Sequence, residues 1–265
     1  MKVTRIDRTL LQRYLIACLF LCFGMSFAAT LAASQQLERA WYGLYPLPVG
    51  GSVSVENVQG EISVEGWDRA EVEITAAKIG KGQDEHLEDV RVVTELGIES
   101  LAIRTVYPPH MDKPVRVDYR LRVPRQVHLA SLRTLEGNIA VHSVEGSVEA
   151  RTLSGNIVEM GMTGRVTART LTGSILVSLK ALPAGTQPLL MDTVNGNIDL
   201  LLPPRPNADL ELSTLDGSIQ GNYAFQVSSA PGDTTRRTRL GLGGVTVTLR
   251  TVRGTIRVAE RDDLL

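Results

Sequence analysis

The chain has 265 residues, enough for one large all-β unit or two modest domains with a buried core. Its charge is nearly balanced, with 28 basic and 29 acidic residues, and the part after residue 33 carries 24 − 28 = −4 charges. This mildly acidic body argues against a nucleic-acid partner, which would require a broad basic surface.

Residues 1–33 have the pattern of an export signal. A basic segment precedes an apolar run that starts at Tyr14 and ends in the small residues AATLAAS. We expect cleavage near Ala33 and export to the periplasm or cell envelope. The alternative is an uncleaved membrane anchor, since about 20 apolar residues can cross a bilayer, and membrane contact is expected only in that case. Because Cys18 and Cys22 both lie in this segment, the cleaved protein would have no disulfide and no thiol nucleophile.

Residues 34–124 are predicted to form an irregular N-terminal β-region. Runs such as VRVVTEL and VRVDYRLRVP alternate apolar and polar side chains, which is typical of strands with one buried face. After residue 40, no window keeps the apolar spacing of an amphipathic helix for three turns. No flexible linker follows, so we expect this region to share one sheet system with the next.

Residues 125–258 repeat one phrase, T-L-x-G-N-I. A glycine recurs every nine residues from Gly137 to Gly173, and the strong form of the phrase stands at every second one. It returns as TVNGNI, TLDGSI and TVRGTI at Gly196, Gly217 and Gly254. A fixed period indicates a solenoid, so the predicted fold is all-β, a single-stranded parallel β-helix with about 18 residues per full rung.

Stacking of like on like predicts columns of identical residues. Isoleucines two positions after the strong glycines, and Leu or Val two positions before, are expected to form two buried aliphatic columns: Ile139, Ile157 and Ile175, and Leu135, Leu153 and Leu171. Thr and Asn columns beside them should bond to their own copies one rung away, or alternatively line a sugar-binding groove. An antiparallel meander is the other possible arrangement, but such ladders form only in a parallel stack.

The last part of the chain departs from the even period. The longest insertion, residues 222–244, is polar and rich in glycine, so we expect an exposed arm or loop. Residues 259–265 form a charged tail after the last phrase. Charges at an edge oppose end-to-end strand pairing, so a monomer is expected.

Three stretches carry a resemblance to a known family: PVGGSVSVENVQGEISVEGWDRAEVEI, RLRVPRQVHLASLRTLEGNIAV and LLPPRPNADLELSTLDGSI. Over residues 49–258 the chain resembles the β-strand-repeat domain of unknown function labelled putative adhesin. The resemblance implies a parallel β-helix-like fold on an exported or envelope-associated protein. The family has no agreed catalytic residues, so none is carried over.

Side chains that could carry chemistry are sparse. Glu136 and Glu145, each before a turn glycine, are the candidates for a glycosidase's paired carboxylates. However, the residue before the glycine differs from one repeat to the next, which is typical of a turn position exposed to solvent. The four histidines, His86, His110, His128 and His142, are scattered, so no metal site is expected. No phosphate-binding or dinucleotide motif appears. We therefore expect no catalytic residue and no cofactor.

One pattern is not required by the fold. Arg133, Arg151 and Arg169 stand four residues before consecutive strong glycines, so stacked rungs would place like charges about 5 Å apart. The functional hypothesis is a strip that binds an anionic polymer, such as envelope polysaccharide, or lipid head groups. The alternative is three solvated arginines whose stems cover apolar surface, with Glu149 or Glu159 neutralising part of their charge.

These observations predict a non-enzymatic exported envelope protein. It would present a β-solenoid surface for adhesion, scaffolding, or binding of an envelope polysaccharide or envelope protein. One alternative is a carbohydrate-active β-helix enzyme, which needs a groove with converging carboxylates. The other is an envelope-stress regulator that acts through a partner.

Overall fold

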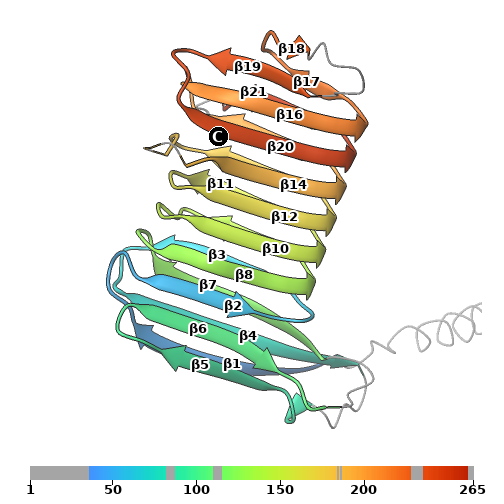
Figure 1. Ribbon diagram of the computed structural model, residues 1–265. Coiled ribbons are helices and arrows are strands. Elements are labelled where there is room, and N and C mark those ends of the chain that lie inside the picture. Colours follow the sequence, from blue (N-terminus) through green and yellow to red (C-terminus); the bar gives the residue numbers. More distant parts are fainter. Residues whose placement is uncertain are drawn as a thin grey trace, which may run out of the picture.

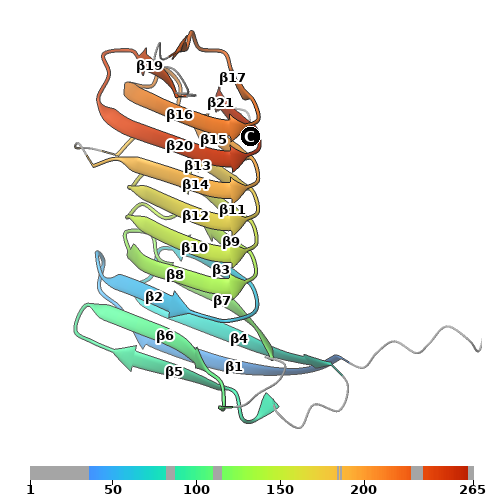
Figure 2. The ribbon, with the colours of Figure 1, turned by 45° about the vertical axis from the view of Figure 1, so that its right-hand side comes forward.

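The computed structural model describes residues 36–81, 87–109, 115–183, 185, 187–227 and 235–261. Over these residues the chain is all-β, as predicted, and forms two large sheets that face each other across the core (Figures 1 and 2). The predicted export signal, with both cysteines, lies outside the described residues. Within the described part, no helix could span a membrane.

Each sheet is a long row of strands. In spatial order the first sheet contains β1 (Gln36–Pro46), β4 (Glu71–Lys81), β7 (Arg116–Pro124), β3 (Ile62–Trp67), β9 (Ile139–His142), β11 (Ile157–Met162), β13 (Ile175–Leu179), β15 (Ile198–Leu202), β21 (Ile256–Glu260) and β17 (Ile219–Gly221). The second sheet contains β18 (Gln226–Val227), β19 (Arg236–Leu240), β16 (Ala208–Asp216), β20 (Val245–Arg253), β14 (Leu189–Asn195), β12 (Val166–Thr172), β10 (Val148–Ser154), β8 (His128–Glu136), β2 (Ser52–Glu56), β6 (Ser100–Val106) and β5 (Arg91–Leu96).

Strands one repeat apart pair in parallel and in register. Ile157 of β11 is the direct partner of Ile139 in β9 and of Ile175 in β13. The prediction of parallel stacking is therefore confirmed for the repeats, and the antiparallel meander is wrong. Among the described strands, antiparallel pairs occur toward the two ends of the stack, for example between β1 and β4 at one end and between β16 and β19 at the other.

The predicted single-stranded parallel β-helix is not confirmed, because each 18-residue repeat supplies one strand to each of two sheets. β8 belongs to the second sheet, the chain turns at Gly137, and β9 belongs to the first sheet. The weaker echoes at Gly146 and Gly164 are the turns that lead back to the second sheet. We call one such pair of strands a rung.

The strong glycines are required by the close approach of successive turns. A Cβ atom on Gly155 would lie 2.0 Å from the carbonyl oxygen of Gly137 in the neighbouring rung. The φ angle of Gly155, 155°, also lies outside the range that side-chain-bearing residues favour. The turn of each rung therefore rests on the backbone of the next, which fixes the register of both sheets.

The two predicted aliphatic columns behave differently. The isoleucine column is fully buried, but Leu135, Leu153 and Leu171 are 48%, 53% and 49% exposed, so their predicted burial is wrong. The reason is the alternation of side chains along a strand. The threonine before each leucine points inward, and the leucine therefore points outward, on the same face as the preceding arginine.

The polar ladders exist, but most of their bonds go to backbone atoms. Thr152 Oγ1 donates to the carbonyl oxygen of Gly137 at 3.1 Å, and Thr170 Oγ1 donates to the carbonyl oxygen of Gly155 at 3.0 Å. In the other ladder, Asn138 Oδ1 accepts from the backbone amide one repeat later at 2.9 Å. Each rung is thus linked to its neighbour by side-chain-to-backbone bonds, and the threonine hydroxyls are occupied.

The rungs do not follow one another in chain order. β20 lies between β14 and β16, so Thr251 pairs with Thr193 on one side and with Thr214 on the other. The insertion 222–244 is not simply an arm, because its β19 pairs with β16 at the edge of the second sheet, while residues 228–234 lie outside the description. The last phrase is therefore internal, and it cannot shield the end of the stack. The expected monomer stays a prediction.

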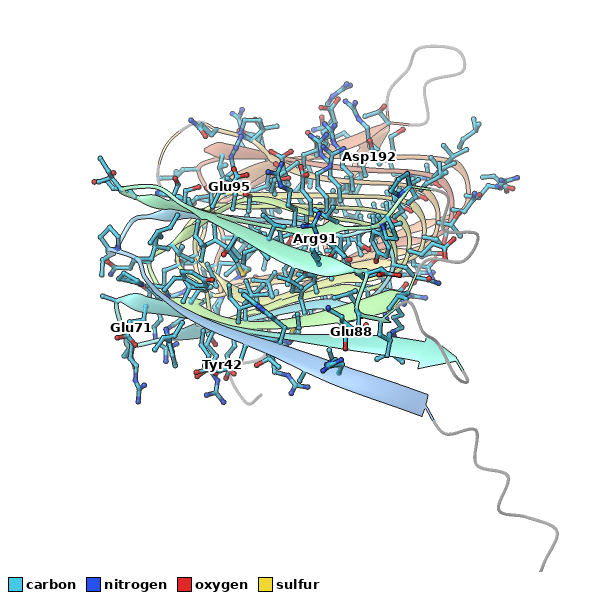
Figure 3. The ribbon with its side chains drawn as sticks, turned by 90° about the horizontal axis from the view of Figure 1, so that it is seen from below. Tyr42, Glu71, Glu88, Arg91, Glu95 and Asp192 are labelled. Atoms are coloured by element: carbon cyan, nitrogen blue, oxygen red, sulfur yellow. The ribbon has the colours of Figure 1, made fainter. Side chains whose placement is uncertain are left out.

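The N-terminal region continues the same two sheets. Ile62 of β3 pairs with Ile139, and β2 pairs in parallel with β8. The segment ENVQGEI around Gly60 is a further copy of the phrase, with Asn57 in the place of the threonine. Viewed from the N-terminal end of the stack, β1 and β5 are the outermost strands on opposite sides of the core (Figure 3). The proposed boundary between residues 124 and 125 stays a prediction.

Candidate functional site

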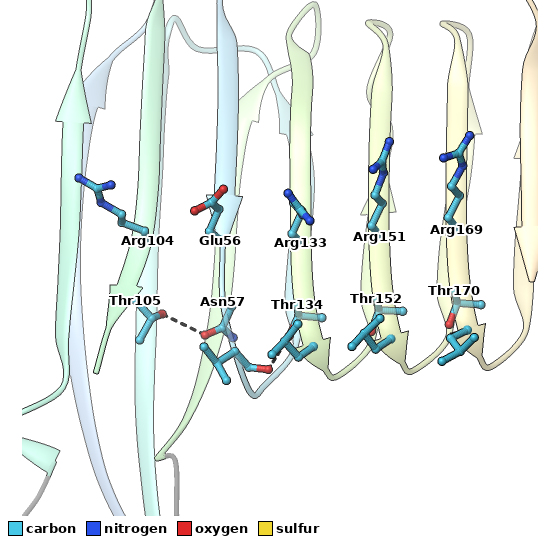
Figure 4. Close-up of a pocket in the computed structure, with 14 residues that line it drawn as sticks. Glu56, Asn57, Arg104, Thr105, Arg133, Thr134, Arg151, Thr152, Arg169 and Thr170 are labelled. Atoms are coloured by element: carbon cyan, nitrogen blue, oxygen red, sulfur yellow. Dashed lines mark hydrogen bonds between the residues drawn. The ribbon is translucent and has the colours of Figure 1, made fainter. Parts of the chain in front are cut away.

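The three predicted arginines form one row on the outer face of the second sheet. Arg151 of β10 is the direct partner of Arg133 in β8 and of Arg169 in β12 (Figure 4). The parallel stack brings them together because each occupies the same position of the phrase. Neighbouring strands in a sheet are about 4.8 Å apart, so the three side chains cover about 10 Å of the stack.

Carboxylates bound this arginine row at both ends. Glu56 of β2 is the register partner of Arg133, and Asp192 of β14 is the partner of Arg169. Beyond them, Arg104 follows Glu56, and Arg250 follows Asp192. A carboxylate and then an arginine therefore follow the row on each side, and the run of like charge is confined to three strands.

Local ion pairs neutralise only part of the row. Glu149 Oε1 lies 2.7 Å from Arg151 Nη2, so this predicted pair is confirmed. Arg133 and Arg169 have no ion-pair partner among the residues that the structure describes. Glu159 cannot serve, because it lies on β11 of the other sheet and is fully buried. An exposed pair such as that of Arg151 contributes at most about 1 kcal/mol.

A row of leucines runs beside the arginine row. Leu135, Leu153 and Leu171 follow the three arginines by two residues, which is about 7 Å along a strand. Both rows line a groove of about 540 Å³ on the outer face, whose full lining is Glu56, Asn57, Val58, Arg104, Thr105, Arg133, Thr134, Leu135, Arg151, Thr152, Leu153, Arg169, Thr170 and Leu171. One wall of the groove is thus cationic and the other is apolar. We call it the Arg–Leu groove.

A buried network holds the N-terminal end of the Arg–Leu groove. Asn57 Nδ2 donates to the carbonyl oxygen of Val117 at 2.8 Å, while its Oδ1 accepts from Thr105 Oγ1 at 2.9 Å. The Thr105 hydroxyl also lies 2.7 Å from the Tyr119 hydroxyl. Burial raises the pKa of Tyr119 to about 12, although the Thr105 hydrogen bond opposes the shift. These side chains are therefore neutral and bonded to one another, which makes them structural.

The other candidates from the sequence do not form a site together. Glu136 ends β8 at the turn into the first sheet, whereas Glu145 lies at the opposite turn, before β10. Each accepts a hydrogen bond from a glutamine, at 3.3 and 3.4 Å. His128 Nδ1 lies 3.0 Å from the Ser147 hydroxyl, while His86 and His110 lie outside the described residues. Among the described side chains, no group of three His, Cys, Asp or Glu could hold a metal ion.

The leucine wall was missed in the sequence, although its signal was there. In the run Arg133–Thr134–Leu135, only alternate residues share a face, so a buried threonine implies that arginine and leucine point outward together. Assigning the leucines to the core by hydrophobicity alone gave the wrong face. Applied strictly, the period-two rule predicts the Arg–Leu groove.

Neither a protein-family model nor a curated protein sequence matches this chain. Several solved structures share a low similarity with it. A putative cell adhesion protein from Clostridium sporogenes has 9% identity and a TM-score of 0.37, with 84% of this chain and 100% of that chain covered. A putative adhesin from Bacteroides fragilis has 11% identity and a TM-score of 0.34, with 83% and 97% covered. A putative lipid binding protein from Parabacteroides distasonis has 11% identity and a TM-score of 0.31, with 84% and 97% covered.

Proposed function

We propose that this chain is a non-enzymatic exported protein of the cell envelope, of the putative-adhesin type, whose β-solenoid presents the Arg–Leu groove to an anionic ligand. The stacked rungs act as a rigid frame, and binding rather than chemistry is the function. The export signal predicted for residues 1–33 supports the location, and the family resemblance supports the adhesion or scaffolding role.

The observation that carries the proposal is the uninterrupted row of Arg133, Arg151 and Arg169. Neighbouring like charges about 5 Å apart repel by about 1 kcal/mol in water, and this outward position contributes nothing to the core. Any polar residue would satisfy the strand there. An anionic ligand removes the repulsion and gains charge-assisted hydrogen bonds from the guanidinium groups.

The lining of the groove also argues for binding over catalysis. Glycoside hydrolysis needs two carboxyl groups about 5–10 Å apart on one cleft. Glu56 is the one acidic side chain among the described residues that line the Arg–Leu groove, and its register neighbours are Arg104 and Arg133. The geometry therefore supports an anion-binding surface better than a glycosidase.

A binding measurement with dextran sulfate, a soluble anionic glycan, tests this proposal. The variant R133Q/R151Q/R169Q should lose at least about tenfold in affinity, and the loss should shrink as salt rises. The matched control R120Q/R122Q/R257Q removes the same charge from the first sheet and should keep most of the affinity. Equal losses in both variants, or none in either, would show that the arginine row has no specific role.

A further inference from the structure

The Arg–Leu groove fits a compact anion better than a long one. Its three arginines cover about 10 Å of the stack, and Glu56 and Asp192 stand in register at either end. A polyanion that continued along the stack would meet a carboxylate in both directions. Arg104, the next cation beyond Glu56, already pairs with Glu95. The row therefore matches one anionic group about three strands wide.

The leucine wall requires an apolar part in the same ligand. Leu135, Leu153 and Leu171 are each about half exposed and lie in a line parallel to the arginines. Three neighbouring exposed leucines are favourable only when something covers them, because apolar surface in water costs free energy. A ligand that covers both walls needs a charged end and an apolar end, roughly 7 Å apart.

The threonines that separate the two rows along each strand offer no donor to a sugar, because their side chains point into the core. The hydroxyls of Thr134, Thr152 and Thr170 are buried, and each donates to a glycine carbonyl of the neighbouring rung. They have no proton left for a ligand oxygen. Glycan hydroxyls held against the leucine wall would lose water without gaining partners, which is unfavourable.

We propose that the Arg–Leu groove binds a single anionic phospholipid molecule. Its phosphate accepts hydrogen bonds from the arginine row, where planar guanidinium groups can bind phosphate oxygens in pairs. One acyl chain lies along the leucine row and covers it. This inference rests on the proposed function, because it names the ligand class of the same groove. The site would make the protein a lipid-binding element of the envelope.

Titration calorimetry with short-chain lipids separates the contributions of the two walls. The probes are monomeric dihexanoyl phosphatidylglycerol, its zwitterionic counterpart dihexanoyl phosphatidylcholine, and glycerol phosphate, which lacks acyl chains. We expect phosphatidylglycerol to bind at least about tenfold more tightly than either of the others, because only it satisfies both walls. All measurements use the full chain, and far-UV circular dichroism checks that each protein keeps its fold.

Two triple variants assign the walls. R133Q/R151Q/R169Q should abolish the preference for phosphatidylglycerol over phosphatidylcholine. L135S/L153S/L171S should reduce phosphatidylglycerol binding to the level of glycerol phosphate and leave dextran sulfate binding unchanged. The matched control I98S/L215S/L242S alters three exposed apolar residues outside the groove and should bind as the unaltered protein does.

The outcomes distinguish this inference from the proposed function. If phosphatidylglycerol and glycerol phosphate bind equally, or the leucine variant keeps full lipid affinity, the lipid assignment is overturned. The proposed function still stands in that case if dextran sulfate binding depends on the arginine row. If neither probe depends on the arginine row, both conclusions fall.

Discussion

Glu159 is a carboxylic acid in the core of the stack, and its replacement should stabilise the protein. It lies on β11 with no exposed surface, between Val141 and Val177 in the register of the first sheet. Among the described residues, neither carboxyl oxygen has a hydrogen-bond partner. Among the buried side chains that the structure describes, it is the one Asp, Glu, Lys or Arg.

The magnitude follows from the pKa of this group. Burial raises the pKa of Glu159 from 4.5 to about 8, because the charged form loses its water. The folded state therefore holds a proton that the unfolded state releases between these two values. Its stability is greatest below pH 4.5 and falls as the pH rises toward 8. At about 1.4 kcal/mol per pKa unit, the loss amounts to about 3 kcal/mol at pH 7 and about 5 kcal/mol above pH 8.

Two variants divide this effect. Glu159→Gln keeps the shape of the side chain but cannot lose a proton. Its free energy of unfolding should therefore lack the fall between pH 5 and 8 that Glu159 causes in the unaltered protein. Glu159→Leu also removes the unpaired polar group and places at this position the residue type that Leu200 supplies two strands away in the same column. It should raise the free energy of unfolding at pH 7 by at least about 3 kcal/mol. For a chain of this size, that corresponds to a melting temperature roughly 10 °C higher.

Urea unfolding followed by circular dichroism at pH 5, 6, 7 and 8 measures these differences. All titratable groups other than Glu159 are common to the three proteins, so their contributions cancel in the comparison. The reasoning is refuted if Glu159→Gln and the unaltered protein show the same slope of stability against pH. A destabilising Glu159→Leu variant would likewise show that the carboxyl group has a partner in the folded protein.

Three further predictions concern the stack itself. Gly155→Ala should destabilise the fold by at least about 3 kcal/mol, because its Cβ would lie 2.0 Å from a carbonyl oxygen, whereas Gly50→Ala, with open space around it, should cost only about 1 kcal/mol in urea unfolding. Thr152→Val should cost about 1 kcal/mol in the same assay, since it removes one hydrogen bond to the neighbouring rung, and an unchanged stability would show that this ladder is dispensable. A chain that ends at Gly244 lacks β20 and β21, so hydrogen exchange should show β17, whose one partner among the described strands is β21, unprotected, and retained protection would contradict this pairing.

The period of the sequence was sufficient to predict the stack and its register. Ile139, Ile157 and Ile175 share one position of the phrase, and only parallel stacking places them in one column. The same rule, applied position by position, also gives the inward Thr152 and the outward Leu153. It further places Glu159 among the inward residues, because it stands four residues after Gly155, as Val141 does after its own glycine.

The order of the rungs could not be predicted from the phrase. Thr193, Thr214 and Thr251 occupy identical positions, and each makes the same bond to a glycine carbonyl of a neighbouring rung. Any order of stacking would therefore satisfy the local pattern equally well. The choice depends on the connections between rungs, where the insertion 222–244 lets the chain pass over one position and return to fill it.

Methyl NMR of the Arg–Leu groove tests the central claim most directly. With labelled leucine methyl groups, dihexanoyl phosphatidylglycerol is titrated into the protein below its micelle concentration. We predict that the methyl signals of Leu135, Leu153 and Leu171 shift progressively. The methyl signals of Leu215, an exposed leucine outside the groove, should keep their chemical shifts. Unchanged signals from the three groove leucines, or equal shifts at Leu215, would contradict the claim that the two rows form one binding site.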